Sequence, residues 1–412
     1  MIAISGRPNA LDREVSALSP HALLTQPPGT LIDPARAAAA AHLEQFHIPA
    51  WSVMIALQIA VLAWFWSSGN SARLRDYLRS IVRSEFTVRF CYGAAVALIG
   101  RLAAFIPQAL QYRFERLMDL NALLFRAWLV EWIASTLIAM LAAGLIAAVV
   151  LWLADRTHQW YVYAIAGVIG FTLLVSYANP TAIAPAYTPF ATFAPTRTLA
   201  RDIAALRERT GITVPIVQEQ AYPRTHIGSS YVLGWGGSQK IVVSDTLLRG
   251  ATEREMRFVV ARAFAWVAAN DGLHVALVEG AFFVVGTALA VFASDRIGFR
   301  RDDDPVSRLA LLGAVMGCFY LIGLPFYNGY MRNVDVSADQ AAIALAAQMW
   351  PGDPRPDAIR LEVREADQAL RPPCPNRFAY WYFNQHPAVG PHIASLQGRP
   401  APSACAPVRL SR

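Results

Sequence analysis

The sequence feature that most constrains the fold is a long charge-free apolar run, residues 133–154. A helix of this length, rising 1.5 Å per residue, crosses the roughly 30 Å hydrocarbon core of a bilayer. The whole chain is 55% hydrophobic and only 16% charged over 412 residues. That composition is too apolar for an ordinary soluble domain of this size. The sequence therefore predicts an integral, multi-pass membrane protein in contact with the lipid bilayer.

Six apolar runs in all are candidates for membrane helices. The first is short but has tryptophans at its edges, where amphipathic indoles sit at the headgroup level. The second contains Arg101 and Pro107, so it either faces the inside of the bundle or spans the membrane poorly. Because the number of spans is even, both termini are expected on one side of the membrane. The predicted spans are residues 51–66, 90–110, 133–154, 160–178, 273–294 and 309–330.

The polar segments divide the rest of the chain. The first fifty residues are rich in Pro and Ala and predict a loose extension. Beyond residue 179 several prolines end the helical pattern, and three short runs predict strands. The expected fold is mainly α, a polytopic membrane helix bundle with a small α+β domain at the membrane surface. The expected division is an extension at 1–50, four transmembrane helices at 51–178, a soluble domain at 179–272, two transmembrane helices at 273–330, and the rest of the soluble domain with its tail at 331–412; the strands are expected at 214–217, 231–234 and 241–243.

Charge and cysteine usage exclude two classes of function. The net charge of +7 rests on arginine, since Lys240 is the only lysine. No basic stripe interleaved with aromatic residues is present, which argues against nucleic-acid binding. The four cysteines show no CxxC spacing, which argues against a cysteine zinc site. Only Cys374 and Cys405 lie outside apolar spans, and they are expected to pair only if the tail faces an oxidising compartment.

The soluble domain is organised around a helix predicted at residues 252–272. Thr252 followed by Glu255 forms a capping box, which satisfies two amides at a helix start. The sequence then becomes apolar, so the helix is expected to be buried. In membrane zinc peptidases such a helix carries His-Glu-x-x-His, whose imidazoles hold the metal while the Glu activates water. Here those five positions read Arg262, Ala263, Phe264, Ala265 and Trp266.

Four ordered motifs surround this helix. They are Pro189-Phe190-x-x-Phe193-x-Pro195, Lys240-Ile241-Val242-Val243-x-Asp245-Thr246-Leu247-Leu248, Arg332-x-x-Asp335-x-x-Ala338-Asp339, and His386-Pro387 with Ile393. In this order and spacing they resemble the type I CAAX prenyl proteases, Ste-type membrane zinc metallopeptidases related to the HtpX-type proteases. The resemblance covers most of the chain from about residue 90. It implies a zincin-like soluble domain and zinc in the ancestral family.

The departures from that family fall on its chemistry. Under the resemblance, Arg262 and Trp266 replace the two zinc-ligating histidines and Ala263 replaces the general base. Asp335 stands where the third ligand is normally Glu, and Asp339 is a remnant of the same motif. An always-protonated guanidinium at a ligand position repels a metal ion. The chain is therefore expected to hold no zinc and to have no catalytic residues in working order.

Other site positions also differ. Ser229 stands where the family has an Asn that holds the substrate backbone, and His392 stands where it has an Arg. His386 resembles the family's oxyanion-supporting His, and without a metal we expect it to have a structural role. Glu279 lies inside an apolar run. It either marks a functional site, since charges in a bilayer are costly, or lies at the interface or beside a water-filled chamber.

Two questions about the former metal site stay open at this stage. Arg262 either pairs with Asp335 or Asp339, replacing the metal as the link between two helices, or faces solvent. A relocated metal site is the alternative, because Asp271 and His274 lie one turn apart and together with Asp335 offer one imidazole and two carboxylates.

The first functional hypothesis is a catalytically inactive pseudo-protease. Such a protein would bind hydrophobic or prenylated peptides, or a membrane protein partner, without cutting them. An alternative is an active CAAX-type metalloendopeptidase with displaced zinc ligands. A further alternative is a structural membrane subunit.

Two features of the sequence predict opposite orientations of the protein in the membrane. The resemblance implies that the soluble domain is cytosolic. Four arginines in the first loop, Arg73, Arg75, Arg79 and Arg83, indicate by the positive-inside rule that this loop is cytoplasmic, which would put the soluble domain outside. The cytosolic assignment is taken as the expectation.

Overall fold

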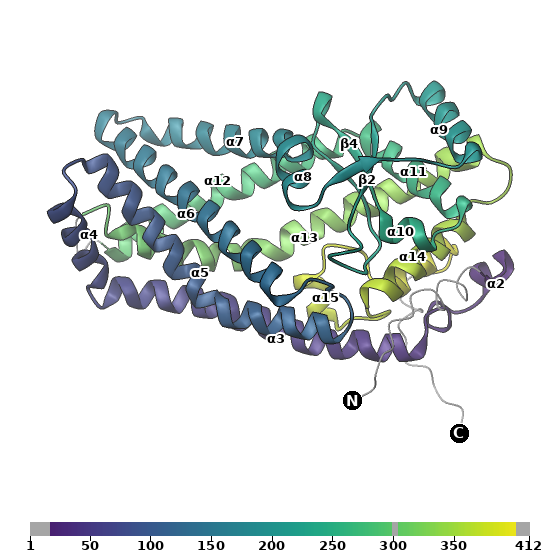
Figure 1. Cartoon of the computed structure of the whole chain (residues 1–412), viewed down its shortest axis with the longest axis horizontal. Coiled ribbons are helices and arrows are strands. Elements are labelled where there is room, and N and C mark those ends of the chain that lie inside the picture. Colours follow the sequence, from purple (N-terminus) through teal and green to yellow (C-terminus); the bar gives the residue numbers. More distant parts are fainter. Residues whose placement is uncertain (1–16, 299–303, 401–412) are drawn as a thin grey trace.

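The membrane part is a bundle of long helices that lie roughly side by side (Figure 1). The computed structural model describes residues 17–298 and 304–400, and within them six helices are long and apolar enough to cross a membrane. This confirms the predicted number of spans. A short amphipathic helix, α4 (Asn70–Ile81), joins the first two at the end of the bundle remote from the soluble domain. The six helices are α3 (Pro34–Ser67), α5 (Glu85–Leu117), α6 (Phe125–Arg156), α7 (Trp160–Ala178, which continues through a π turn and α8, Ala184–Tyr187), α12 (Asp271–Gly298) and α13 (Arg308–Met349).

The prediction of a loose extension at residues 1–50 is wrong for the part that the structure describes. Helix α3 begins at Pro34, after Asp33, whose carboxylate accepts the amides of Ala35 and Arg36. A run of alanines then favours the helix. Ahead of it, α2 (Pro20–Thr25) and the residues that follow it bury Leu23, Leu31 and Ile32 in the core of the soluble domain. This segment is therefore part of the folded domain.

The soluble domain contains a four-stranded sheet in the order β1-β2-β4-β3. β2 and β4 are parallel, with Ile216 opposite Ile241, and the two outer pairs are antiparallel. Gly234, in the turn between β3 and β4, has a φ of +76°, a conformation that favours glycine. Strand β1 was not predicted, because prolines flank it. The strands are β1 (Phe190–Thr192), β2 (Ile216–Glu219), β3 (Ser230–Leu233) and β4 (Lys240–Ser244).

Helix α11 (Glu253–Ala268) is the centre of this domain. Its apolar side chains, among them Phe258, Val260 and Phe264, are buried in the main core cluster. The main packing partner of α11 is α13, the long helix that continues from the bundle into the domain. The other helices of the domain are α9 (Arg197–Thr210), α10 (Asp245–Gly250), α14 (Arg355–Ala369), α15 (Arg377–Phe383) and α16 (Val389–Leu396).

A buried ion pair joins α11 to α14, a helix that was not predicted. Glu255 and Arg364 are both fully buried, with 0% of each side chain exposed, and Arg364 Nη2 lies 3.1 Å from Glu255 Oε1. The same carboxylate accepts the amide of Thr252, which completes the predicted capping box. One glutamate therefore caps the central helix and holds its neighbour.

This pair makes the first testable prediction. The Arg364→Met variant leaves the Glu255 carboxylate buried without its cation, so we expect the free energy of unfolding to fall by ~3–5 kcal/mol. Adding Glu255→Gln should restore part of that loss, because no uncompensated charge remains. Chemical unfolding in detergent measures both. Arg355→Met, an exposed arginine on the same helix, is the control. A double variant less stable than Arg364→Met alone would contradict the role given to the pair.

Candidate functional site

The site is built around Arg262, which reaches from α11 to two aspartates on α13. Arg262 Nε lies 2.8 Å from Asp339 Oδ1, and its Nη2 lies 3.9 Å from Asp335 Oδ1. The arginine side chain is 22% exposed, while both aspartates are buried. The sequence left open whether Arg262 forms an ion pair or faces solvent. In the structure it forms the ion pair. Asp339 is the closer partner.

A histidine approaches each aspartate from the C-terminal segment. His392 Nε2, on α16, lies 3.0 Å from Asp339 Oδ2, and His386 Nδ1 lies 2.6 Å from Asp335 Oδ2. Each carboxylate thus has one oxygen near Arg262 and the other near an imidazole. Arg332 donates to the backbone carbonyls of Tyr380 and Asn384, which fixes the segment that carries His386. His386 is 61% exposed, whereas His392 is buried.

Charged side chains of α14 and of Arg371, which follows it, surround this centre and were missed by the sequence analysis. Arg371 Nη2 lies 3.3 Å from Glu362 Oε1 and 3.7 Å from Glu365 Oε2. Burial lowers the pKa of Arg262, but the carboxylates of Asp339, Glu365 and Asp335 more than offset it and hold that pKa above its usual value. Burial raises the pKa of Glu365. The signal for this helix was the Arg/Glu-rich run itself, whose charges are buried in mutual pairs.

The charge on His392 completes the balance. Burial lowers its pKa, but the hydrogen bond to Asp339 and the nearby Glu362 raise it more, so the pKa lies above its ordinary value of 6.5. When it is protonated, His392 adds its positive charge to those of the two arginines beside the carboxylates. Protonation of Glu365 and protonation of His392 each reduce the net negative charge of the cluster.

The remaining positions of the former motif offer no metal ligand. Ala263 is buried and has no polar atom. The indole of Trp266 has a buried Nε1 without a hydrogen-bond partner in the described residues, and an indole N–H is a donor only. Trp266 therefore occupies volume and coordinates nothing.

The residues present do not fit a zinc ion. Zinc takes neutral imidazole, carboxylate or thiolate donors, and here a guanidinium lies against the two carboxylates. Within residues 17–298 and 304–400, no group of three or more His, Cys, Asp and Glu side chains is arranged to hold a metal ion. No such group joins Asp271, His274 and Asp335, and the relocated site that their sequence spacing suggested stays a prediction; His274 is exposed.

A cavity of about 490 Å³ adjoins the site. His386 contributes to its wall, together with Arg371 and two polar residues of α3, Glu44 and His47. Most of the rest of the lining is apolar and comes from α3, α13 and the segment around α15, including Leu43, Ile48, Trp51, Tyr320, Leu324 and Phe383. The sequence did not indicate which residues line it, because the α3 residues that form one wall were assigned to a loose extension.

Three other polar residues that the sequence analysis named form hydrogen bonds within the protein. Glu279 accepts a 2.6 Å hydrogen bond from the hydroxyl of Tyr327, which joins α12 to α13. Arg101 donates to Ser135 and Thr136 of α6. The amide of Ser229 donates to the hydroxyl of Ser244 at 2.9 Å, next to the start of β3.

Two families match consecutive parts of the chain. Residues 40–188 match the family described as CAAX prenyl protease N-terminal, five membrane helices, and residues 196–399 match peptidase family M48. An uncharacterized metalloprotease of Bacillus subtilis (strain 168), YhfN, is 22% identical over 293 residues, which are 68% of this chain and 67% of that protein. The crystal structure of S. mikatae Ste24p superposes with a TM-score of 0.61 at 15% identity, over 87% of this chain and 98% of that one, and shows the same fold.

Coupling across the site gives the second prediction. Arg262→Met and Asp339→Asn should show a coupling free energy of ~1–3 kcal/mol in a double-mutant cycle of unfolding, because each single variant leaves a largely buried charge without its nearest partner. The coupling of Arg262→Met with Asp335→Asn should be smaller, since that distance is 3.9 Å. The more exposed pair Arg355 and Asp353, with 43% and 34% of their side chains exposed, is the control, with an expected value below ~1 kcal/mol. Coupling at Asp339 no larger than in the control would show that the ion pair does not hold the helices together.

The third prediction concerns pH. A pKa raised in the folded state means that the folded protein binds more protons than the unfolded one, so stability falls as pH rises. For His392 this loss begins above pH 6.5, the ordinary value of its pKa, and for Glu365 above 4.5. We expect the melting temperature to decline as pH rises above 6.5, and the decline to be weaker in His392→Gln. The exposed His274→Gln variant should keep the wild-type slope. A slope unchanged by His392→Gln would remove His392 from the charge balance.

Proposed function

Because this chain belongs to the M48 family of membrane metallopeptidases, with a CAAX prenyl protease type of membrane domain, we propose that it is a catalytically inactive member that binds peptide segments. In this proposal it is a pseudo-protease. Its ligand is a hydrophobic or prenylated peptide, or an apolar segment of a membrane protein partner.

The observation that carries the proposal is the contact between Arg262 and Asp339. The guanidinium of Arg262, 2.8 Å from the Asp339 carboxylate, occupies the position at which members of this family would hold a zinc ion. Without a metal there is no polarised water to attack a peptide bond at neutral pH. Ala263 also removes the side chain that would act as general base.

The cavity supports the binding half of the proposal. Its volume of about 490 Å³ lies within the range of ligand-binding pockets, which are mostly apolar with a few polar groups. Leucine, isoleucine and aromatic side chains form most of the wall, with His386 and Arg371 toward the former metal site. An apolar side chain or an isoprenoid suits such a lining, and the polar groups suit a peptide backbone or a terminal carboxylate.

The enzyme with displaced ligands is less well supported. It would need three donors near one point, and the described parts of the chain offer no such group. A purely structural subunit would not need a cavity beside the remnant of the active site. Binding of a peptide therefore separates the proposal from the structural alternative.

The fourth prediction tests binding and cleavage together. Leu324 lines the cavity, so Leu324→Trp should fill part of it and weaken the binding of a fluorescent farnesylated CAAX peptide by about tenfold or more. Ile322→Trp, on the same helix but 61% exposed on the outer surface, is the matched control and should bind normally. Fluorescence anisotropy in detergent measures both, and an unprenylated apolar peptide of equal length tests the class of ligand.

Mass spectrometry of the recovered peptide completes the test. We expect the peptide to stay intact. Cleavage that a chelator abolishes would contradict inactivity. Equal affinity of the two tryptophan variants, with both correctly folded, would contradict the assignment of the cavity as the binding site.

A further inference from the structure

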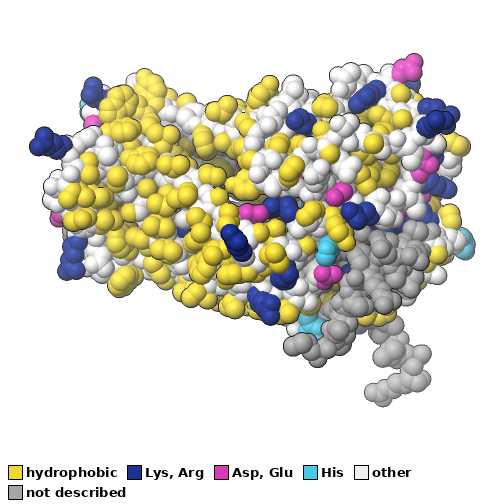
Figure 2. Space-filling view, in the orientation of Figure 1, with side chains coloured by type: hydrophobic (Ala, Val, Ile, Leu, Met, Phe, Trp, Pro, Cys, Tyr) yellow, Lys and Arg dark blue, Asp and Glu magenta, His cyan; other side chains and the backbone are white. Residues whose placement is uncertain are grey.

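The end of the bundle remote from the soluble domain is a basic surface. Helix α4 lies here, together with the ends of α3, α6 and α12 and the beginnings of α5, α7 and α13 (Figure 1). In the space-filling view, basic side chains gather at this end, beyond a wide apolar band (Figure 2). The loops between the membrane helices at this end lie at one face of the membrane, and the soluble domain lies at the other face.

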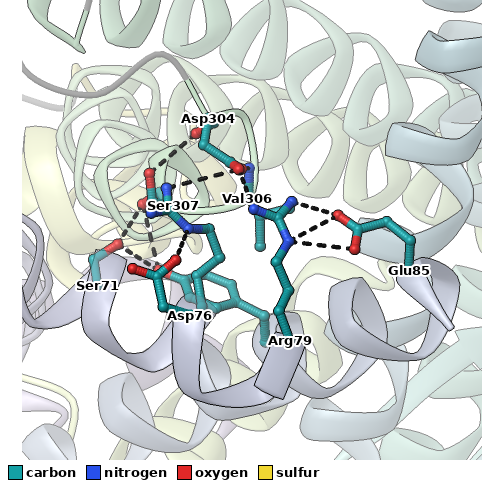
Figure 3. Close-up of polar contacts among 9 residues, drawn as sticks. Ser71, Asp76, Arg79, Glu85, Asp304, Val306 and Ser307 are labelled. Atoms are coloured by element: carbon teal, nitrogen blue, oxygen red, sulfur yellow. Dashed lines mark hydrogen bonds and ion pairs between the residues drawn. The ribbon is translucent and has the colours of Figure 1, made fainter. Parts of the chain in front are cut away.

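Several acidic residues of this end are already paired. Arg79 of α4 contacts both Glu85 and Asp304, and Arg75 Nε lies 2.8 Å from Asp76 (Figure 3). The hydrogen bonds to Glu85 hold the pKa of Arg79 above its usual value, aided by Asp304. These contacts tie α4 to the start of α5 and to the segment that precedes α13. The carboxylates are therefore engaged within the protein.

The two remaining acids of the described residues at this end are also paired. Arg89 contacts Asp155, and Arg308 Nη1 lies 3.4 Å from Asp295. Four further arginines are exposed and have no carboxylate within ion-pair distance among the residues described. Beside them, α4 and the start of α5 expose apolar side chains, which suits insertion at a headgroup boundary. The four arginines are Arg73, Arg83, Arg156 and Arg296, and the apolar side chains are Tyr77, Ile81 and Phe86.

An independent observation comes from the other face. Cys374, between α14 and α15 of the soluble domain, is disulfide-bonded. Cys405, the partner that the sequence suggests, lies outside the described residues. The two cysteines in membrane helices, Cys91 and Cys318, are free thiols. Disulfides persist in oxidising compartments and are rare in a reducing cytosol.

We propose that the four unpaired arginines bind the anionic phospholipid headgroups of the cytoplasmic leaflet, and that the soluble domain with the Arg262 site faces the oxidising side. The positive-inside rule and the attraction of basic residues to an anionic leaflet place the arginine end in the cytoplasm. The disulfide places the opposite face outside. The two observations come from opposite ends of the molecule and agree. This orientation is the reverse of the one that the family resemblance implies, and the ligand of the cavity then comes from the oxidising side.

Cysteine labelling in intact cells tests the orientation. In a background of Cys91→Ser and Cys318→Ser, Ser80→Cys reports on α4 and Glu208→Cys reports on α9; both positions are exposed. With a membrane-impermeant maleimide, we expect Glu208→Cys to be labelled in intact cells and Ser80→Cys only after permeabilisation. The reverse pattern, or labelling of both in intact cells, would overturn the proposal. In the unmodified chain, acid-trapped lysates should show Cys374 protected until reduction, and a free thiol there would also overturn it.

Lipid binding is tested on the full chain with phosphatidylglycerol as the probe. The protein is reconstituted in vesicles of phosphatidylcholine with or without phosphatidylglycerol and then purified. Replacement of the four arginines by Gln should reduce the phosphatidylglycerol that co-purifies with the protein by about tenfold. The matched control replaces four exposed arginines of the other face, Arg113, Arg126, Arg197 and Arg201, by Gln and should retain it. Equal loss in both variants, or loss in neither, would refute the headgroup site. Melting temperatures show whether each variant is folded. None of these readouts depends on peptide binding.

Discussion

Two buried aspartates on α13 need a positive charge, and Arg262 supplies it from α11. A carboxylate taken out of water without a partner costs several kcal/mol, so the packing of these two helices depends on this contact. The surrounding groups follow the same requirement. Arg371 adds positive charge, as does His392 when it is protonated, and the burial of Glu365 favours its neutral form. The site is thus a balanced cluster of charges in which a metal ion has no place.

The continuity of α13 connects this cluster to the membrane. A single helix from Arg308 to Met349 crosses the apolar band and then carries Asp335 and Asp339 into the soluble domain. The cavity lies along it, between the helix, α3 and the C-terminal segment that holds His386. A ligand in the cavity would touch both the membrane part and the remnant of the active site. Binding there can affect the packing of the two parts without any chemical step.

Much of the architecture could be predicted from the sequence, because apolar length and turn chemistry are local signals. The bounds predicted for α7 match the structure, and the sequence offered Asp335 or Asp339 as a partner of Arg262, with a solvent-facing arginine as the alternative. The failures have a common physical origin. Polar stretches were assigned to the exterior, whereas residues 23–32 bury apolar side chains in the domain core and α14 buries its charges in ion pairs. Only the tertiary structure brings those partners together, and it also forms the cavity.

The central claim is that an arginine has taken the place of the metal, and the zinc content of the purified protein tests it most directly. Elemental mass spectrometry of protein from zinc-supplemented cells should find far less than one zinc per chain. A variant with Arg262→His, Ala263→Glu, Trp266→His and Asp335→Glu, which restores the family's ligands, is measured beside it as the positive control. Stoichiometric zinc in the unmodified protein would contradict the account.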